Sequence, residues 1–262
     1  NFGYLRKRWK DNTEEERLLG VSLTGIMDNS ILSRIRSTLP ETLQDMRQKA
    51  VSVNKEWSEK LGISQSTAIT CVKPSGTVSQ LVDSASGIHA RHNPYYIRTV
   101  RGDKKDPLTE FMKDQGIPCE DDVMNPHNSV FSFPMKADSN AVFRDDMTAI
   151  EQLEIWKCYA EHWCEHKPSV TISVKEHEWI NVGNWCWDNF DALSGISFLP
   201  FSDHTYQQAP YQDIDKATYE ELAAKMPKNI NWSELSNFEK EDTTKGSQEL
   251  ACTAGSCELV DI

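Results

Sequence analysis

Segments with the spacing of amphipathic helices alternate along this sequence with short runs typical of buried strands. The clearest helix is expected over residues 40–62, because Pro40 suits a first-turn position, Gly62 suits the end, and apolar residues recur at three- and four-residue steps between them. Further helices are expected over 1–19 and 150–166, and strands at 21–27, 68–72, 95–101, 129–133 and 170–174. This alternation predicts an α/β fold.

The composition limits what the chain can do. It has 262 residues with 28 basic against 40 acidic side chains, a net charge of −12, eight tryptophans and a hydrophobic fraction of 38%. Such a chain forms one large domain or two small ones, at roughly 100–200 residues a domain. The acidic balance argues against binding to DNA or RNA, because nucleic-acid phosphates need a basic face. No run approaches the roughly 18 apolar residues of a membrane helix, so we expect no membrane span.

Both ends of the sequence are informative. It begins with Asn1 rather than methionine, and the apolar run of a secretory signal does not follow. We therefore expect part of a longer polypeptide, or a product of processing or of expression design. From residue 233 the sequence is polar and charged, as a flexible linker would be. The prediction is a domain over 1–232 and a flexible tail over 233–262.

Seven cysteines are present, and five of them are scattered among apolar or aromatic neighbours, as in reduced cytoplasmic proteins. A cytoplasmic location is therefore expected. The other two are Cys252 and Cys257, where four small residues between them would let the sulfurs approach. A disulfide on a mobile tail suits thiol–disulfide exchange, and we favour that role. Half of a zinc site and two ordinary tail cysteines are the alternatives.

The segment 70–81 predicts a strand, a loop and a helix in succession. The loop residues Pro74, Ser75, Gly76 and Thr77 would present backbone N–H groups and two hydroxyls at a helix N-terminus, where negative charge is favoured. Gly76 would allow a ligand to approach the backbone closely. The sequence is not that of a P-loop. The alternative is a plain turn with a helix cap, which the spacing alone favours.

A possible zinc site is suggested by His162-Trp-Cys-Glu-His166, which has the H-x-x-E-H spacing of one group of zinc hydrolases. A catalytic zinc needs a third ligand, for which Glu176 and His177 are candidates. The alternative is that the histidines simply suit the negative end of a helix, and we favour it.

A basic patch is suggested by the segment 87–101. It contains His89 and His92 beside three arginines, at positions 91, 98 and 101. These side chains would either face a phosphate or pair with carboxylates, and we favour pairing.

Several segments resemble the large chains of ribonucleotide reductases. The segment 70–81, followed by Ala85-Ser-Gly-Ile-His89, is similar to the substrate-phosphate segment of that family. The segments 20–28, 199–201, 206–210 and 214–220 follow the order seen in the monomeric adenosylcobalamin-dependent (class II) ribonucleoside-triphosphate reductases. The terminal Cys-x4-Cys completes the match, so the resemblance covers nearly the whole chain.

The resemblance implies the second half of the ten-stranded α/β barrel of the family, followed by a flexible C-terminal redox tail. The family carries its radical cysteine in an Asn-Pro-Cys-x-Glu loop, and this sequence contains no such motif. The radical chemistry would therefore need an N-terminal half, supplied by the same or a separate chain. We expect no metal-binding residues in this half.

The implied reaction replaces the 2′-hydroxyl of a ribonucleotide, by resemblance a triphosphate, with hydrogen. Adenosylcobalamin would provide the radical step and two thiols the electrons. The loop 74–77 would hold the substrate phosphates. Cys252 and Cys257 would reduce the spent disulfide and then be reduced by thioredoxin. A deoxynucleotide effector is a further implied ligand.

Class II is favoured because the sequence lacks the features that mark the other two classes of ribonucleotide reductase. Class I large chains carry a Tyr-Tyr dyad on the last barrel strand, but the matching run 170–174 has no tyrosine, and Tyr95-Tyr96 comes too early. Class III chains end in a glycyl-radical motif, which residues 251–262 do not form. The alternatives are a class I fragment, a non-catalytic reductase remnant and a zinc hydrolase.

Overall fold

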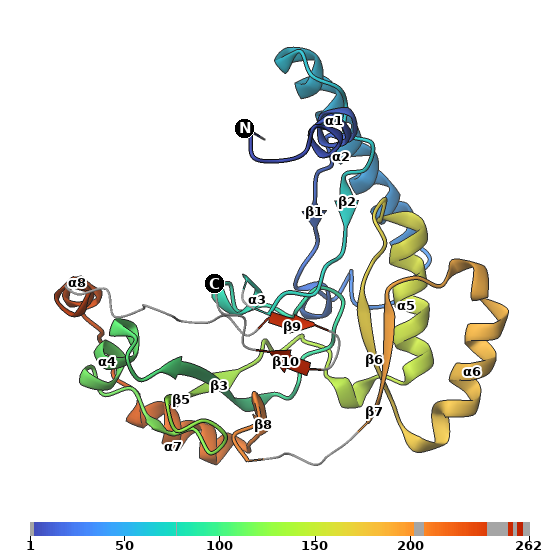
Figure 1. Ribbon diagram of the computed structural model, residues 1–262. Helices are drawn as coiled ribbons and strands as arrows, with labels where there is room; N and C mark the ends of the chain where they lie inside the picture. The colour runs from blue at the N-terminus through green and yellow to red at the C-terminus, as the bar shows by residue number, and fades with distance from the viewer. Residues whose placement is uncertain (1–2, 77, 202–206, 240–250, 254–255, 259–262) are drawn as a thin grey trace. The chain divides into compact units, whose positions relative to one another are not determined.

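A computed structural model of the chain describes residues 3–76, 78–201 and 207–239, together with the backbone of 251–253 and 256–258. The chain divides into two compact units (Figure 1). Unit 1 comprises Asn1–Pro94 and Ala137–Asp203, and unit 2 comprises Tyr95–Lys136 and His204–Ile262. Each unit is therefore built from two stretches of the sequence.

Unit 1 contains two pairs of parallel strands with helices around them. Strand β1 pairs with β2, and β6 pairs with β7, both in parallel. Its elements in chain order are α1 (Lys7–Glu16), β1 (Val21–Ser22), a 3-10 helix (Ile26–Asp28), α2 (Leu39–Leu61), β2 (Thr70–Cys71), α3 (Val78–Leu81), a 3-10 helix (Arg144–Asp146), α5 (Ala149–His162), β6 (Val170–Val174), a 3-10 helix (Glu176–Glu178), α6 (Trp179–Asp188), a 3-10 helix (Phe190–Ala192) and β7 (Ile196–Pro200).

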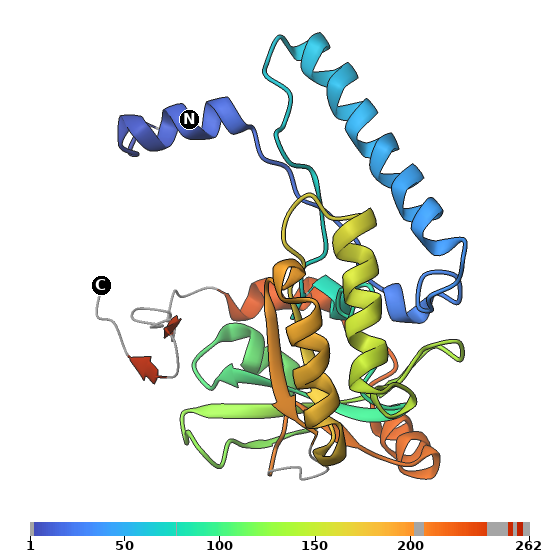
Figure 2. The same ribbon diagram turned by 90° about the vertical axis from the view of Figure 1, so that its right-hand side faces the viewer.

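The helix predicted over 40–62 is confirmed as α2. Pro40 lies in its first turn, and Gly62 ends it with φ of 65°, donating its N–H to the Glu59 carbonyl. Only the first part of α2 packs on the core, where Leu39 and Leu43 are buried. Figure 2 shows the start of α2 beside α5 and its end directed away from that helix.

The strand predicted over 21–27 is wrong beyond Ser22. Gly25 adopts a left-handed conformation with φ of 70° and donates its N–H to the Ala85 carbonyl. The chain then turns into a 3-10 helix in which Ile26 and Met27 are buried. The apolar alternation that predicted a strand therefore reflects burial of a turn. The first helix is also shorter than predicted, because it ends at Glu16 rather than at Gly20.

The core of unit 1 lies between α5 and strand β6. Trp156, Tyr159 and Ile172 are fully buried there. The polar tips of the large aromatic side chains are satisfied, since Trp156 Nε1 donates to the Pro168 carbonyl at 3.2 Å and Tyr159 OH to the Leu32 carbonyl at 3.0 Å. The helix predicted over 150–166 is confirmed, although it ends at His162.

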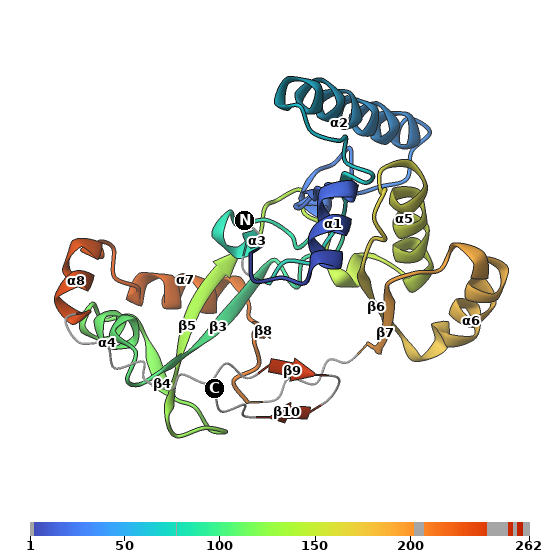
Figure 3. The same cartoon turned by 45° about the horizontal axis from the view of Figure 1, so that its top comes forward.

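Unit 2 is an antiparallel sheet of four strands in the order β4-β5-β3-β8. Figure 3 shows α7 beside β5 and β3, with which it is in contact. The elements of this unit are β3 (Tyr95–Asp103), α4 (Pro107–Asp114), β4 (Cys119–Asp121), β5 (Asn128–Lys136), β8 (Tyr211–Asp213), α7 (Lys216–Lys225), a 3-10 helix (Trp232–Glu234), α8 (Leu235–Phe238), β9 (Ala251–Thr253) and β10 (Ser256–Glu258).

The residues that follow the predicted domain boundary at 232 are helical up to Phe238. The Trp232 ring lies 5.3 Å, and the Phe238 ring 5.6 Å, from the ring of buried Phe111 on α4. Although the sequence from residue 233 is mostly polar, Trp232 and Phe238 thus pack on Phe111 and form a hydrophobic anchor. The boundary at 232, the flexibility of the tail and the closure of a barrel stay predictions.

The mixed helix and strand content confirms the α/β class. In the part of the chain that the structure describes, no helix is both long and apolar enough to cross a membrane.

Candidate functional site

The loop predicted to bind phosphate connects β2 to the short helix α3. Ser75 Oγ accepts a hydrogen bond from the Ser79 N–H at 3.0 Å, and Ser79 Oγ donates to the Ser75 carbonyl at 2.7 Å. Ser75 is therefore bonded to the first turn of α3, and this contact is compatible with the alternative of a plain turn that caps a helix. Gly76 faces open space, with nothing within 4 Å of the position that a Cβ would take. Thr77 lies outside the described residues.

A second loop, residues 83–89, packs against the loop 74–77, which we call the phosphate loop. The Ser75 N–H donates to Ser86 Oγ at 2.7 Å. Gly87 has φ of +54°, and a Cβ there would lie 2.7 Å from the Lys73 carbonyl oxygen. Any side chain at Gly87 would push the two loops apart. We call residues 83–89 the support loop.

Buried charges fix the support loop in turn. The Arg91 side chain is 5% exposed, and it donates to both carboxylate oxygens of Asp28, at 2.9 and 3.0 Å. It also donates to the carboxylate and the carbonyl of Asp83. Asp28 Oδ2 accepts the Ala85 N–H at 2.6 Å. Of the two interpretations of Arg91, pairing with carboxylates is therefore the one that the structure confirms.

The other arginines of the predicted basic patch belong to unit 2. Arg98 Nη1 donates to the Pro210 carbonyl at 3.1 Å, and its guanidinium lies 4.6 Å from the centre of the Tyr211 ring. Arg101 pairs with buried Asp122 at 3.0 Å and donates to the Gln208 carbonyl. These contacts tie together the strands of that sheet.

His89 joins the support loop to strand β6. Its Nδ1 lies 3.0 Å from the Ser86 carbonyl oxygen, and its Nε2 lies 3.0 Å from the backbone N of Thr171. A carbonyl needs a donor and an N–H needs an acceptor, so the imidazole is neutral and carries its proton on Nδ1. Burial lowers the pKa of His89, and the bond to the Ser86 carbonyl partly opposes this effect.

The lowered pKa of His89 predicts a pH-dependent stability. As the pH falls below 6.5, the ordinary value of histidine, the unfolded chain binds a proton that the folded protein binds only at lower pH. The free energy of unfolding should therefore decrease by at most about 1.4 kcal/mol per pH unit from this group. Denaturant titrations of the wild type and of His89→Gln should show the larger acid loss in the wild type. Equal slopes in both proteins would contradict this prediction.

The histidines of the possible zinc site have other partners. His162 Nδ1 is 2.9 Å from Gln44 Nε2, and His166 Nε2 lies 2.7 Å from the Leu19 carbonyl. Glu165 accepts the N–H groups of Ile69 and Thr70. Among the described residues, no group of three His, Cys, Asp or Glu side chains could hold a metal ion. His166 and Glu165 thus contact the backbone next to β1 and β2, and His162 contacts α2.

Cys158 and Cys164 are buried in unit 1, whereas Cys252 and Cys257 lie on the terminal strands β9 and β10. Burial raises the pKa of Cys158 to about 11 and that of Cys164 to about 12, so both thiols stay protonated and unreactive. The backbone register of β9 and β10 places Cys257 opposite Cys252. The side chains of this pair lie outside the described residues, and their redox role stays a prediction.

Sequence reasoning missed most of the supporting structure. It did not link Asp28 to Arg91, or Ser75 to Ser86. One signal was available, because Ser86 and His89 lie in the segment 85–89 that was already set apart by its resemblance. Asp28 ends another segment with such a resemblance, residues 20–28, but nothing in the sequence links it to Arg91, which lies 63 residues further on.

Comparison with known proteins agrees with these motifs. No family model matches the sequence. The adenosylcobalamin-dependent ribonucleoside-triphosphate reductase of Lactobacillus delbrueckii subsp. bulgaricus is 26% identical, across 94% of this chain and 37% of the relative. The enzyme of the same name from Euglena gracilis is 29% identical, across 95% and 35%. A probable one from Dictyostelium discoideum is 31% identical, across 79% and 27%.

The chain is therefore similar in sequence to part of these reductases. A crystal structure of a B12-dependent (class II) ribonucleotide reductase matches with a TM-score of 0.77 and 23% identity, covering 88% of this chain and 36% of that one. The resemblance seen in the motifs is thus confirmed, and the fold is that of part of a class II reductase. The chain spans about a third of the length of these curated relatives.

Proposed function

We propose that this chain is the C-terminal part of a class II ribonucleotide reductase. The observation that carries the proposal is the similarity to such reductases over 94% of the chain, joined to the shared fold. The reaction is the reduction of ribonucleoside triphosphates to 2′-deoxyribonucleotides by radical chemistry. For each turnover, two thiols become a disulfide, and the 2′-hydroxyl leaves as water.

Within that reaction, we assign the phosphates of the substrate to the loop 74–77. Arg91 is neutralised by Asp28 and Asp83, so it supplies no free charge to a ligand. Phosphate binding would therefore rest on backbone N–H groups and hydroxyls of the loop. Gly76 is the proposed point of approach, because it is exposed and nothing lies within 4 Å of the position that a Cβ would take.

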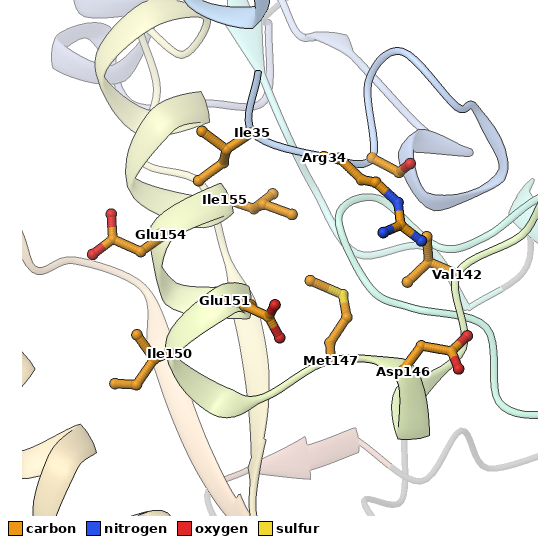
Figure 4. Close-up of a pocket in the computed structure, with 10 residues that line it drawn as sticks. Arg34, Ile35, Val142, Asp146, Met147, Ile150, Glu151, Glu154 and Ile155 are labelled. Carbon is orange, nitrogen blue, oxygen red and sulfur yellow. The ribbon is translucent and has the colours of Figure 1, made fainter. Parts of the chain in front are cut away.

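Adenosylcobalamin is the proposed cofactor, and it supplies the radical when bound. Three pockets of unit 1 have volumes of about 360, 590 and 820 Å³, which suit drug-sized ligands. A corrin with its nucleotide tail and adenosyl group is considerably larger. The smallest is lined by Arg34, Asp146, Met147 and Glu151 among others, and the Glu151 carboxylate already caps α5 (Figure 4). These pockets do not fit the cofactor, and we assign it to no residue of this chain.

The proposed partners follow from the same assignment. An N-terminal half, in the same or a separate chain, would supply the Asn-Pro-Cys-x-Glu loop. Cys252 and Cys257 would pass electrons from thioredoxin to the active-site disulfide. A deoxynucleotide would act as effector, and the location would be cytoplasmic.

Enlarging Gly76 or removing the Thr77 hydroxyl should weaken binding of the substrate. In the complete reductase, Gly76→Leu should crowd the ligand, and Thr77→Val should remove a charge-assisted hydrogen bond worth about 1.5–3 kcal/mol. Each change should raise the KM for CTP about tenfold or more, measured by steady-state kinetics.

Gly183→Leu is the matched control. Gly183 also has nothing within 4 Å of its Cβ position, but it lies on α6. The same substitution there should leave the KM unchanged. An unchanged KM in both loop variants would assign the loop to structure alone.

A further inference from the structure

We propose that His89 is a positioning residue that ties the phosphate loop to strand β6. This inference rests on the proposed function of the loop 74–77. It adds a residue that holds the loop in position through the support loop and does not touch the ligand.

A chain of three hydrogen bonds carries the inference. The Thr171 N–H donates to Nε2 of His89, and Nδ1 of His89 donates to the Ser86 carbonyl. Ser86 Oγ then accepts the Ser75 N–H at 2.7 Å. Each link joins backbone to side chain, so the position of Ser75 is coupled to that of β6.

Strand β6 is a rigid anchor for this chain of bonds. Val170, Ile172 and Val174 point into the core and are at most 5% exposed. The strand is paired along its whole length with β7. Movement of Thr171 would require movement of the core, whereas the phosphate loop has no comparable packing at Gly76.

Direct contact of His89 with a phosphate is disfavoured by the same geometry. Both ring nitrogens are already bonded to backbone groups, and burial opposes the charged imidazolium that would attract an anion. Arg91 is likewise held by Asp28 and Asp83. The proposed binding groups are therefore those of the loop, and their affinity depends on being held in place before the ligand arrives.

Two variants can separate the two bonds of His89. In His89→Asn the side-chain amide replaces Nδ1 and can still donate to the Ser86 carbonyl. In His89→Gln the side-chain carbonyl replaces Nε2 and can still accept from the Thr171 N–H. His89→Ala removes both bonds, and His162→Ala removes a histidine at the end of α5 as the matched control.

The experiment uses NMR on the 262-residue chain, with amide exchange rates and the ¹⁵N shifts of the His89 ring. In the wild type, Nδ1 should be protonated and Nε2 should not. In His89→Ala, protection of the Ser75 amide should fall about tenfold, as expected for one lost hydrogen bond. His89→Asn should restore much of that protection, His89→Gln should restore protection of Thr171 instead, and His162→Ala should change neither. The Asn and Gln variants carry the comparison if the Ala variant does not fold.

Calorimetric titration with inorganic tripolyphosphate measures the consequence for binding. The dissociation constant should rise about tenfold in His89→Ala and less in His89→Asn. A protonated Nε2 in the wild type, or unchanged protection of the Ser75 amide in His89→Ala, would overturn the proposed coupling of Ser75 to β6 through His89. Unchanged affinity in a variant with a loosened loop would overturn the positioning role. Lack of tripolyphosphate binding by the wild type would instead reject the phosphate assignment, while the exchange rates still decide whether the tie exists.

Discussion

Asp28→Ala is expected to lower the free energy of unfolding of unit 1 by about 3–5 kcal/mol, because it leaves a buried arginine without its main partner. Arg91 is 5% exposed and donates two hydrogen bonds to the Asp28 carboxylate. The same carboxylate holds the Ala85 N–H, so the support loop would lose an anchor as well. Chemical denaturation followed by tryptophan fluorescence would measure the change.

Asp83 provides the control for this prediction. It pairs with the same guanidinium, but its side chain is 59% exposed. Asp83→Asn keeps a residue that tolerates the left-handed backbone found there, with φ of 47°. The expected loss is below about 1 kcal/mol, as for other exposed ion pairs. Equal losses in the two variants would contradict the view that burial makes Asp28 the more important partner.

Replacing both Cys252 and Cys257 with serine is expected to abolish turnover driven by thioredoxin in the complete reductase. Their proposed role is to supply electrons, so the prereduced enzyme should still complete one turnover. A small thiol that reaches the active site directly should restore part of the rate. The measurement is deoxynucleotide formed per enzyme, in a single turnover and at steady state.

Cys119→Ser is the matched control, because Cys119 is an exposed, free cysteine in unit 2. It should leave thioredoxin-driven turnover unchanged. A structural disulfide between Cys252 and Cys257 predicts the opposite pattern, with a lower melting temperature and intact turnover. A double variant that cycles with thioredoxin at the wild-type rate would reject the electron-transfer role.

The parts of the fold that were predictable depend on neighbours in the sequence. Helix α2 is set by Pro40, Gly62 and the apolar spacing between them, all of which are local signals. The strand over 21–27 was wrong because Gly25 turns the chain toward Ala85, a contact across 60 residues. Sequence periodicity cannot distinguish a buried strand from a buried turn of the same apolar content.

The candidate site shows the same division. The position of the loop 74–77 between a strand and a helix was predictable, because the sequence carries both elements. Its attachment was not, because Ser75 is held by Ser86 and the support loop by Asp28, which lies 63 residues from Arg91. The hydrophobic anchor of Trp232 and Phe238 was missed for a related reason, since isolated aromatic residues in a polar segment have no period.

The central claim is that this chain is the C-terminal part of a class II reductase and needs an N-terminal half for activity. The most direct test is the conversion of CTP to dCTP with adenosylcobalamin and dithiothreitol. The 262-residue chain would be assayed alone and together with the portion of the Lactobacillus delbrueckii relative that it does not span. We predict dCTP only from the combination. Product from the chain alone, or no product from a combination that forms a stable complex, would contradict the account.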